Sequence, residues 1–326
     1  MYIYKSDATG ERFRKALLSA CERGVRVRIL LDYFGSHDLP KDYFIELIKL
    51  GVDVRMFNPS RVLRFAFRNH RKLCVADNHV AIVGGFNIGD EYAGDGVHHG
   101  WRDLGVRITG PLALELTVSF DRMFIAARMD RAALIVFARG LRPSPPPMDR
   151  PALLTSGPGF GGALMRRVLF RDLHSARDVN VVSAYFAPTW SLRRHLSAAA
   201  RHGSVRLILP GRTDVAVLRL AAQHLYARIL KDGALIFEYQ PQVLHAKLLV
   251  IDDVVYVGSS NLDARSLRLN FELLVRLPIT ALAAEARQLI ATDISRSRLI
   301  KPREWQEKSY WWNRIERQLA YWLVTR

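Results

Sequence analysis

The sequence predicts an α/β protein of two similar halves, each an α/β/α sandwich with a mixed sheet, that meet as a pseudo-dimer. Three observations predict this fold: strands alternate with amphipathic helices, one part of the chain repeats another, and a proline-rich stretch separates the two. A chain of 326 residues is also long for one domain and comfortable for two of ~100 to 200 residues each.

The repeat begins close to the start of the chain. Residues 4–31 align without a gap with residues 183–210, and both segments read as strand end, loop, helix and strand. A second helix and strand follow in each copy, at residues 43–57 and 225–239. We therefore expect the same order of elements in both halves.

Each copy then enters a hairpin with the same polar residues. The first hairpin carries His70, Lys72, Asp77, Gly84, Gly85 and Asn87, and the second carries His245, Lys247, Asp252, Gly258, Ser259 and Asn261. Side chains two apart in a strand share a face, so each histidine and its lysine point the same way while the apolar run packs inward.

An acidic residue follows each hairpin. Residues 102–110 align with residues 271–279, so that Asp103 falls opposite Glu272. If the halves are related by a twofold axis, the two histidines meet at the interface in one active site.

This set of residues suits phosphoryl chemistry without a metal or another cofactor. One imidazole can attack an electrophile while the other protonates the leaving group. Lys72, Lys247, Asn87 and Asn261 can bind the phosphate oxygens, and Asp103 and Glu272 can orient the imidazoles. Asp77 and Asp252 are counted with the catalytic motif, although their place at the turns suggests that they brace the hairpins. Asp95, His98 and His99 lie in a glycine-rich segment that we interpret as a solvated loop, not as a metal site.

The domain boundaries follow from the repeat and from the prolines. We expect a first half at 1–141, a proline-rich linker at 142–151, a second half at 152–300 and an amphipathic tail at 301–326. Residues 152–180 have no match in the first half, which is therefore expected to lack an opening strand and helix, through a late start or a truncation.

Composition narrows the class of partner. The net charge of +17 favours anionic partners, either phosphate backbones or acidic lipid headgroups. Only Cys21 and Cys74 are present, so we expect no disulfide framework and a cytoplasm-facing location. The opening residues do not read as a signal peptide, and no apolar run approaches the ~20 residues that span a bilayer.

The two HxKxxxxD motifs, each followed by Gly-Gly or Gly-Ser and by asparagine, resemble those of the phospholipase D superfamily. Within it, the segments around residues 68–92, 101–111 and 245–272 are most similar to bacterial cardiolipin synthases. The resemblance implies phospholipase D-like halves and transfer of a phosphatidyl group between two phospholipids, typically phosphatidylglycerol, through a phosphohistidine. It also implies that His70 makes the attack, which the internal symmetry alone does not decide. Residues 61–68 are expected to contribute to an apolar mouth that favours a lipid alcohol over water.

Other functions remain open at this point. A phosphodiesterase or nuclease of the same superfamily would use the same histidines, and a non-catalytic membrane scaffold is a third possibility. The tail favours lipid, because Trp312, Ile315, Leu319 and Trp322 fall on one helical face, as in helices that lie at membrane interfaces. The alternative is that this helix docks on its own domain. We expect anionic phospholipid substrates and a peripheral position on the cytoplasmic face of a bacterial membrane; the oligomeric state is not predicted.

Overall fold

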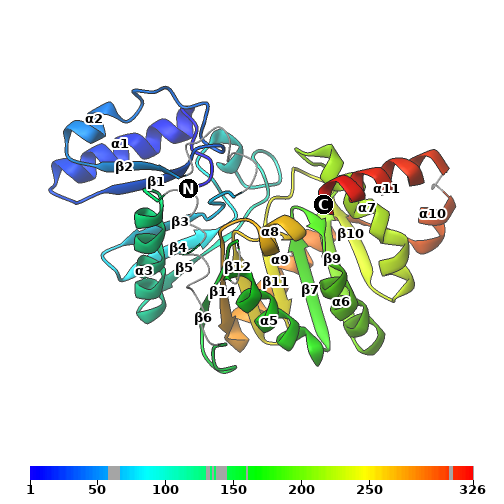
Figure 1. The fold of residues 1–326 in the computed structure, drawn as a ribbon. Coiled ribbons are helices and arrows are strands. Elements are labelled where there is room, and N and C mark those ends of the chain that lie inside the picture. Colours follow the sequence, from blue (N-terminus) through cyan, green and yellow to red (C-terminus); the bar gives the residue numbers. More distant parts are fainter. Residues whose placement is uncertain are drawn as a thin grey trace.

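A computed structural model describes residues 1–57, 67–129, 133, 136, 145–158, 161–307 and 311–325. Its two parts lie side by side, with the first part on the left of Figure 1 and the second on the right. Both parts combine helices with β-sheets, and the predicted fold class of two α/β halves is confirmed.

The second half is organised around one mixed sheet of eight strands. Its order is β15-β10-β9-β7-β11-β12-β14-β6. The strands are β6 (Ala152–Ser156), β7 (Asp178–Ser183), β9 (Ser204–Pro210), β10 (Leu235–Tyr239), β11 (Lys247–Ile251), β12 (Val254–Gly258), β14 (Glu272–Pro278) and β15 (Ser297–Leu299). The parallel strands β7, β9 and β10 are joined through helices, whereas β11, β12, β14 and β6 run antiparallel.

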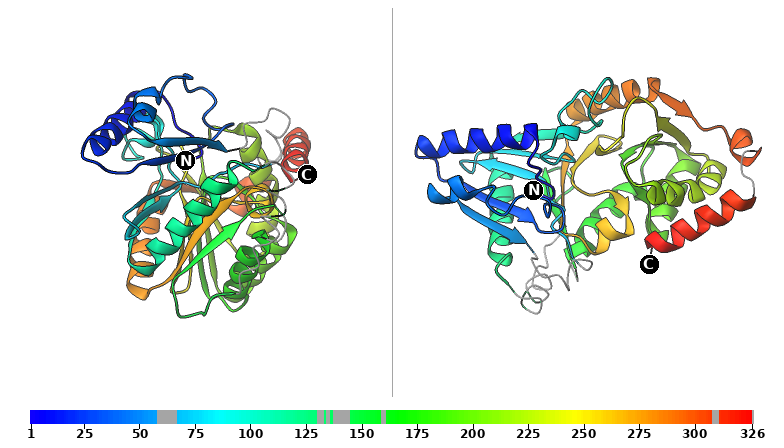
Figure 2. Two further views of the ribbon diagram at one scale, coloured as in Figure 1. Left: turned by 60° about the vertical axis from the view of Figure 1, so that its left-hand side comes forward. Right: turned by 90° about the horizontal axis from the view of Figure 1, so that it is seen from above.

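Helices cover both faces of this sheet. Helices α5 (Gly161–His174), α6 (Trp190–His202) and α7 (Ala216–Lys231) share one apolar core with the sheet, and α9 (Thr280–Ser295) belongs to a core on the other face. Short elements complete the half, namely β8 (Phe186–Ala187), β13 (Leu262–Asp263) and α8 (Ala264–Arg268). At the end of the chain, α10 (Pro302–Glu307) and α11 (Trp311–Thr325) pack against α7, as Figure 2 also shows.

The first half has a similar order of helices and strands, but its strands form two separate sheets. Strands β1 (Arg28–Asp32) and β2 (Asp53–Phe57) form a parallel pair, and β3 (Leu73–Ala76), β4 (Val80–Gly84) and β5 (Gly105–Thr109) form a separate antiparallel sheet. The helices are α1 (Ala8–Glu22), α2 (Ile45–Lys49), α3 (Pro111–Ala126) and the short η2 (Asp90–Tyr92). In the second half, β7 joins β9 to β11; among the described residues of the first half, no strand joins β1 to β3.

The domain boundaries stay predictions. Strand β6 and helix α5 fall within residues 152–180, the segment without a match in the repeat. Of the linker at 142–151, residues 145–151 are described and lead into β6.

The two halves share an apolar core at their interface. Small and branched side chains of β4 and β5, including Ala81, Val83 and Ile108, belong to the same cluster as Val257 and Val275 of the second half. Because burial of a valine or isoleucine side chain contributes about 1.5–3 kcal/mol, this core holds the two hairpins in fixed positions.

A buried charge network stabilises the second half and supplies a test of its packing. Asp172 on α5 accepts hydrogen bonds from Nε of Arg276 at 2.6 Å and from the hydroxyl of Tyr256 at 2.5 Å. Asp172→Ala leaves the guanidinium buried without its partner, so we expect a loss of about 3 to 5 kcal/mol in the free energy of unfolding, measured by urea denaturation. Asp38→Ala, at an exposed position, should change it by about 0.5 kcal/mol or less. Equal effects of the two substitutions would contradict this account.

Candidate active site

The two hairpins present their motifs at the start of matching strands. His70 and Lys72 directly precede β3, and His245 and Lys247 stand at the start of β11. All four side chains are buried. In each hairpin the antiparallel partner strand, β4 or β12, ends at the glycine of the motif.

Each histidine is paired with the acid of the other half. Nδ1 of His70 lies 3.0 Å from the carboxylate of Glu272, and Nδ1 of His245 lies 2.6 Å from Oδ2 of Asp103. The sequence predicted both acids as orienting residues but did not predict that each would contact the histidine of the other half. A twofold axis between the halves is compatible with pairing inside each half or between the halves, so the sequence held no signal for this exchange.

The backbone repeats the same exchange. The amide of His70 donates to the carbonyl of Phe271 at 3.0 Å, and the amide of His245 donates to the carbonyl of Arg102 at 2.8 Å. Phe271 and Arg102 directly precede the two acids. The four contacts, two through side chains and two through the backbone, therefore obey one pseudo-twofold relation.

The two acids are held in different ways. Glu272 accepts hydrogen bonds from the hydroxyl of Ser259 at 2.5 Å and from Nδ2 of Asn270 at 3.3 Å. The shorter Asp103 accepts from the amide of Leu104 at 2.8 Å. At Gly85, the position that matches Ser259, a Cβ atom would lie 2.3 Å from Oδ1 of Asp103. Glycine in one motif and serine in the other thus fit an aspartate and a glutamate, respectively.

The lysines lie against the histidines of their own motifs. Nζ of Lys72 donates to the carbonyl of His70 at 2.8 Å, and Nζ of Lys247 lies 3.0 Å from Nδ1 and 3.1 Å from Nε2 of His245. Burial lowers the pKa of Lys72 well below its ordinary value and lowers the pKa of Lys247 to about 8. A bound anion would offset this penalty, which makes both ammonium groups suitable phosphate ligands.

Burial also lowers the pKa of both histidines. The paired carboxylates oppose this effect but do not overcome it. Each imidazole is therefore neutral at pH 7, with the proton on the Nδ1 that faces the acid. At His70 the Nε2 lone pair then has no hydrogen-bond partner among the described residues and is available for attack or for proton transfer, whereas Nζ of Lys247 lies 3.1 Å from Nε2 of His245.

The asparagines are buried near the ends of the hairpins. Oδ1 of Asn87 accepts the amide of Ile3 at 3.1 Å, which ties the start of the chain to the first motif. Asn261 is also buried, and its Oδ1 has no hydrogen-bond partner within the described part of the chain. Their role as phosphate ligands stays a prediction.

The structure does not bring Asp77 and Asp252 to the histidines. Both lie in the hairpin turns, at the opposite ends of β3 and β11, and have positive φ angles of 52° and 48°. The carboxylate of Asp252 accepts the amides of Arg177 and Asp178 at 3.0 and 2.9 Å. Their inclusion among the catalytic residues is therefore corrected: the contacts of Asp252 brace the start of β7, and neither residue touches the reacting groups.

Aromatic residues that the motif analysis missed surround the histidines. The ring of Tyr2 lies 4.6 Å from that of His70, whereas Tyr92, Trp101 and Tyr185 lie 5.3, 5.4 and 6.3 Å from His245. Tyr92 and Trp101 follow the first motif closely in the sequence. That proximity was the signal that could have placed them near the site. The histidines and acids therefore follow the pseudo-twofold relation, whereas the aromatic residues around them do not.

The other candidate positions lie away from this cluster. Asp95 and His98 form an exposed pair, with Nδ1 of His98 2.7 Å from Asp95. Across the described ranges, no three His, Cys, Asp or Glu side chains gather as metal ligands. Residues 61–66 of the proposed apolar mouth lie outside the described residues.

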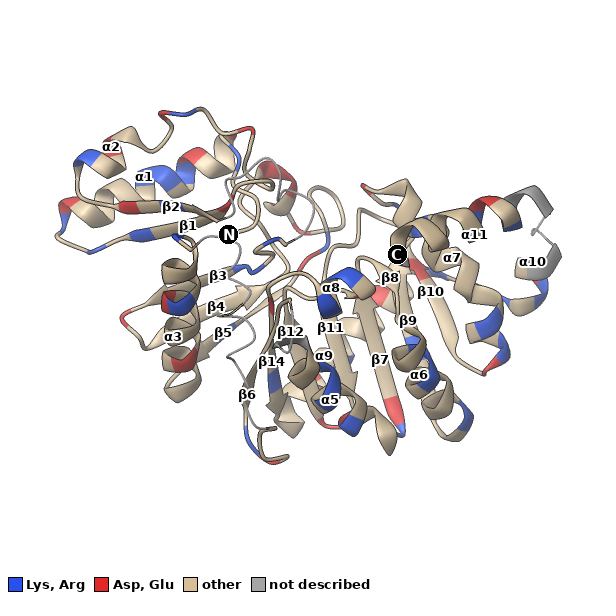
Figure 3. Ribbon diagram, viewed as in Figure 1, with Lys and Arg blue, Asp and Glu red and all other residues tan. Residues whose placement is uncertain are grey.

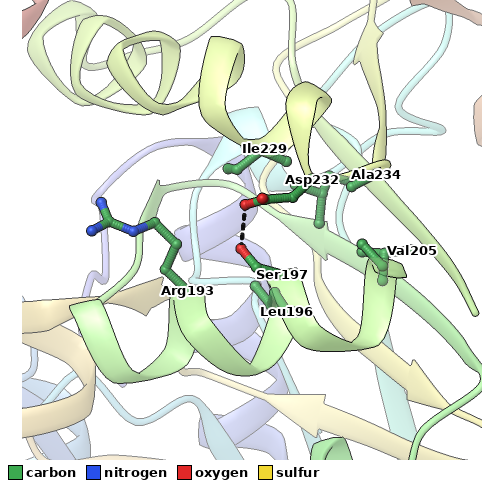
Figure 4. Close-up of a pocket in the computed structure, with 9 residues that line it drawn as sticks. Arg193, Leu196, Ser197, Val205, Ile229, Asp232 and Ala234 are labelled. Carbon is green, nitrogen blue, oxygen red and sulfur yellow. Dashed lines mark hydrogen bonds between the residues drawn. The ribbon is translucent and has the colours of Figure 1, made fainter. Parts of the chain in front are cut away.

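A small pocket lies in the helical layer of the second half. It is lined by Arg193, Leu196, Ser197 and Asp232, among others, and the Ser197 hydroxyl donates to Asp232 at 2.6 Å (Figure 4). Its described lining contains no residue of either motif. We assign it to imperfect packing between α6 and the end of α7.

The helix expected to contact a membrane is docked along one side and exposed along the other. Ala320 of α11 is buried, and Tyr321 stacks on His224 of α7 at 5.0 Å. Ile315, Leu319 and Trp322 are 49%, 62% and 51% exposed. The side chain of Trp312 lies outside the described residues. No helix in the described part of the chain is both long and apolar enough to span a bilayer.

Comparison with known families agrees with this geometry. The family described as cardiolipin synthase, PLD-like domain, matches residues 1–124 and 169–294. The chain belongs to this family. The resemblance to the phospholipase D superfamily and to its cardiolipin synthase branch is thereby confirmed.

Relatives in the family match most of the chain. The major cardiolipin synthase of Bacillus subtilis is 32% identical over 318 residues, and cardiolipin synthase A of Pseudomonas fluorescens is 35% identical over 314 residues. These alignments cover 95% and 93% of this chain. The chain spans 66% and 64% of the lengths of the two relatives, which is less than two thirds.

Solved structures show the same fold at low identity. A phosphatidylserine synthase from Haemophilus influenzae superposes with a TM-score of 0.71 at 15% identity and covers 99% of this chain and 88% of its own. A polyphosphate kinase from Porphyromonas gingivalis gives 0.59 at 11% identity, covering 93% of this chain and 43% of its own. At these low identities, both similarities show a shared fold only.

The protonation of the two histidines can be tested by NMR. At about pH 6 a histidine with an ordinary pKa of about 6.5 is mostly charged, whereas we expect neutral ¹⁵N signals for His70 and His245 because burial lowers their pKa. Diethyl phosphate, a permanent anion at this pH, should raise the pKa and convert one signal to imidazolium. His70→Asn and His245→Asn would assign the signals. Two charged imidazoles at pH 7 without ligand would contradict the expected state.

Proposed function

We propose that the protein is a phosphatidyltransferase that makes cardiolipin from two phospholipids, of which phosphatidylglycerol is the expected donor and acceptor. The observation that carries the proposal is the single buried cluster in which each half supplies a histidine, a lysine and the acid for the other half. Membership of the cardiolipin synthase family supports the choice of lipid.

In the first step, Nε2 of one histidine attacks the phosphorus of phosphatidylglycerol. An N–P bond forms, the P–O bond to the headgroup glycerol breaks, and the second histidine gives its proton to the departing oxygen. Binding of the anionic phosphodiester raises the pKa of the second imidazole, so the acid is charged only when substrate is present. Lys72 and Lys247 stabilise the negative oxygens around phosphorus.

In the second step, a hydroxyl of another phosphatidylglycerol attacks the phosphohistidine. The second histidine accepts the hydroxyl proton, the P–O bond forms and the N–P bond breaks, which frees the first imidazole and returns the second to the imidazolium that began the first step. Asp103 and Glu272 keep each ring in the Nδ1–H tautomer through both steps. The family resemblance assigns attack to His70 and proton transfer to His245.

Incubation with labelled phosphatidylglycerol tests the scheme. His70→Ala and His245→Ala should each reduce cardiolipin formation by about 10³-fold, measured by mass analysis of the lipids, because each removes a partner in proton or phosphoryl transfer. His245→Ala should accumulate an acid-labile phosphatidyl adduct on His70. An adduct on His245 in His70→Ala instead would reverse the roles. Full synthesis by either variant, or cleavage of DNA without lipid transfer by the unmodified protein, would refute the function.

We further propose that the protein acts at a membrane surface through the exposed side of α11. Ile315, Leu319, Trp322 and Leu323 form an apolar stripe on this helix, while its other side is held against α7. Lys and Arg are distributed over α5, α6 and α8 (Figure 3), and the net charge of +17 favours an anionic surface. Docking on the domain and contact with lipid are thus compatible, because they use different sides of α11.

Vesicle binding tests this surface. The double substitution Leu319→Ser and Trp322→Ser should weaken binding to vesicles that contain phosphatidylglycerol by about tenfold or more, because each side chain removes apolar area from the contact. Leu114→Ser, at a 50% exposed position on α3, is the matched control and should bind as the unmodified protein does. Sedimentation of protein with vesicles measures both. Equal binding by all three proteins would exclude α11 as the contact.

A further inference from the structure

A half-buried arginine lies beside the proposed catalytic cluster and has no assigned role. Nη1 of Arg68 donates to the hydroxyl of Tyr2 at 3.1 Å, and its guanidinium lies 3.9 Å from the centre of the Phe34 ring. Tyr2 in turn contacts the ring of His70. Nε of Arg68 is buried without a hydrogen-bond partner among the described residues, so one donor remains for a ligand.

Arg265 brings a second guanidinium to the same place from the other half. The carbonyl of Arg68 accepts the amide of Phe271 at 2.8 Å, and the carbonyl of Arg265 accepts the amide of Asn270 at 3.0 Å. Consecutive residues of one segment therefore hold the two arginines close to each other. Burial, and then the charge of Arg68, lower the pKa of Arg265. An anion between two such groups would relieve their repulsion.

The nearby acids are already engaged. Oδ1 of Asp32 accepts the amides of Phe34 and Gly35, and its Oδ2 accepts the amide of Asn69. Asp263 accepts the amide and hydroxyl of Ser266. Asp32 and Asp263 also interact electrostatically with Arg68 and Arg265, respectively, but the hydrogen bonds named here come from backbone amides and a hydroxyl.

The arginine pair occurs on one side of the pseudo-twofold axis only. The repeat places Val243 opposite Arg68 and Glu91 opposite Arg265. Glu91 forms an ion pair with Lys5 at 2.5 Å. A single phosphate bound between the two histidines would need equal groups from both halves, so the arginine pair exceeds what the reacting phosphate requires.

We propose that Arg68 and Arg265 bind a second phosphate, the phosphodiester of the acceptor phospholipid, while the first is attached to the catalytic histidine. This inference rests on the proposed phosphatidyl transfer. In phosphatidylglycerol the attacking terminal hydroxyl and the phosphate sit at the two ends of one glycerol, so the two phosphates come close in the product. Guanidinium groups bind phosphate through paired N–H···O contacts. The pair would thus favour a phospholipid acceptor over water or a simple alcohol.

Competition between two acceptors tests the subsite. The full-length protein is given phosphatidylglycerol vesicles and a fixed concentration of ethanol, and cardiolipin and phosphatidylethanol are measured together. Both products arise from the same phosphohistidine, so their ratio is independent of the amount of folded enzyme and of donor binding. We expect Arg68→Gln and Arg265→Gln each to lower the ratio of cardiolipin to phosphatidylethanol by about tenfold or more, the usual loss for a charged phosphate contact.

Conservative and distant variants complete the test. Arg68→Lys should recover part of the ratio because it keeps the charge, and Arg12→Gln, on the exposed side of α1, should leave it unchanged. An unchanged ratio in both Arg68→Gln and Arg265→Gln, with both products reduced together, would overturn the subsite and leave the transfer mechanism intact. Absence of both products with the unmodified protein would instead refute the proposed function on which the subsite rests.

Discussion

The exchange of acids between the halves is the constraint on which the rest of the site depends. His70 is oriented by Glu272 and His245 by Asp103, so neither histidine has a fixed tautomer unless both halves are assembled. The apolar interface core and the paired backbone contacts of Phe271 and Arg102 serve this exchange directly. Any change that separates the two halves is therefore expected to abolish the proposed chemistry as well.

Burial gives the site its response to substrate. Burial disfavours the charged forms of the histidines and of Lys72, because a buried charge loses its hydration. It therefore lowers the pKa of all three groups. A phosphodiester anion supplies the missing negative charge and makes protonation favourable. In the proposed mechanism, the protein therefore charges its acid and its phosphate ligands when substrate binds, instead of maintaining charged groups in an empty site.

The sequence predicted what repetition and side-chain periodicity encode, and missed what depends on packing across the interface. The repeat predicted His70, His245 and both acids as site residues, because the HxKxxxxD spacing is identical in the two copies and the acids align after the hairpins. The partner of each acid was not predicted, since sequence distance says nothing about which strand crosses the axis. Tyr2, Arg68 and Arg265 were missed for a related reason. They lie outside the motifs in three distant segments, and only the folded structure shows that these segments are close together.

The divided sheet of the first half has a consequence for dynamics. In the described ranges, β1 pairs with β2 alone and β3 with β4 alone, so residues 1–57 are joined to the rest of the first half by side-chain and loop contacts and not by a continuous sheet. These include the amide of Asn69 on Asp32 and the amide of Ile3 on Asn87. A local opening of this layer would expose the His70 side of the cluster without global unfolding. Amide hydrogen exchange in β1 that is faster than in the strands of the second half would show that this layer opens on its own.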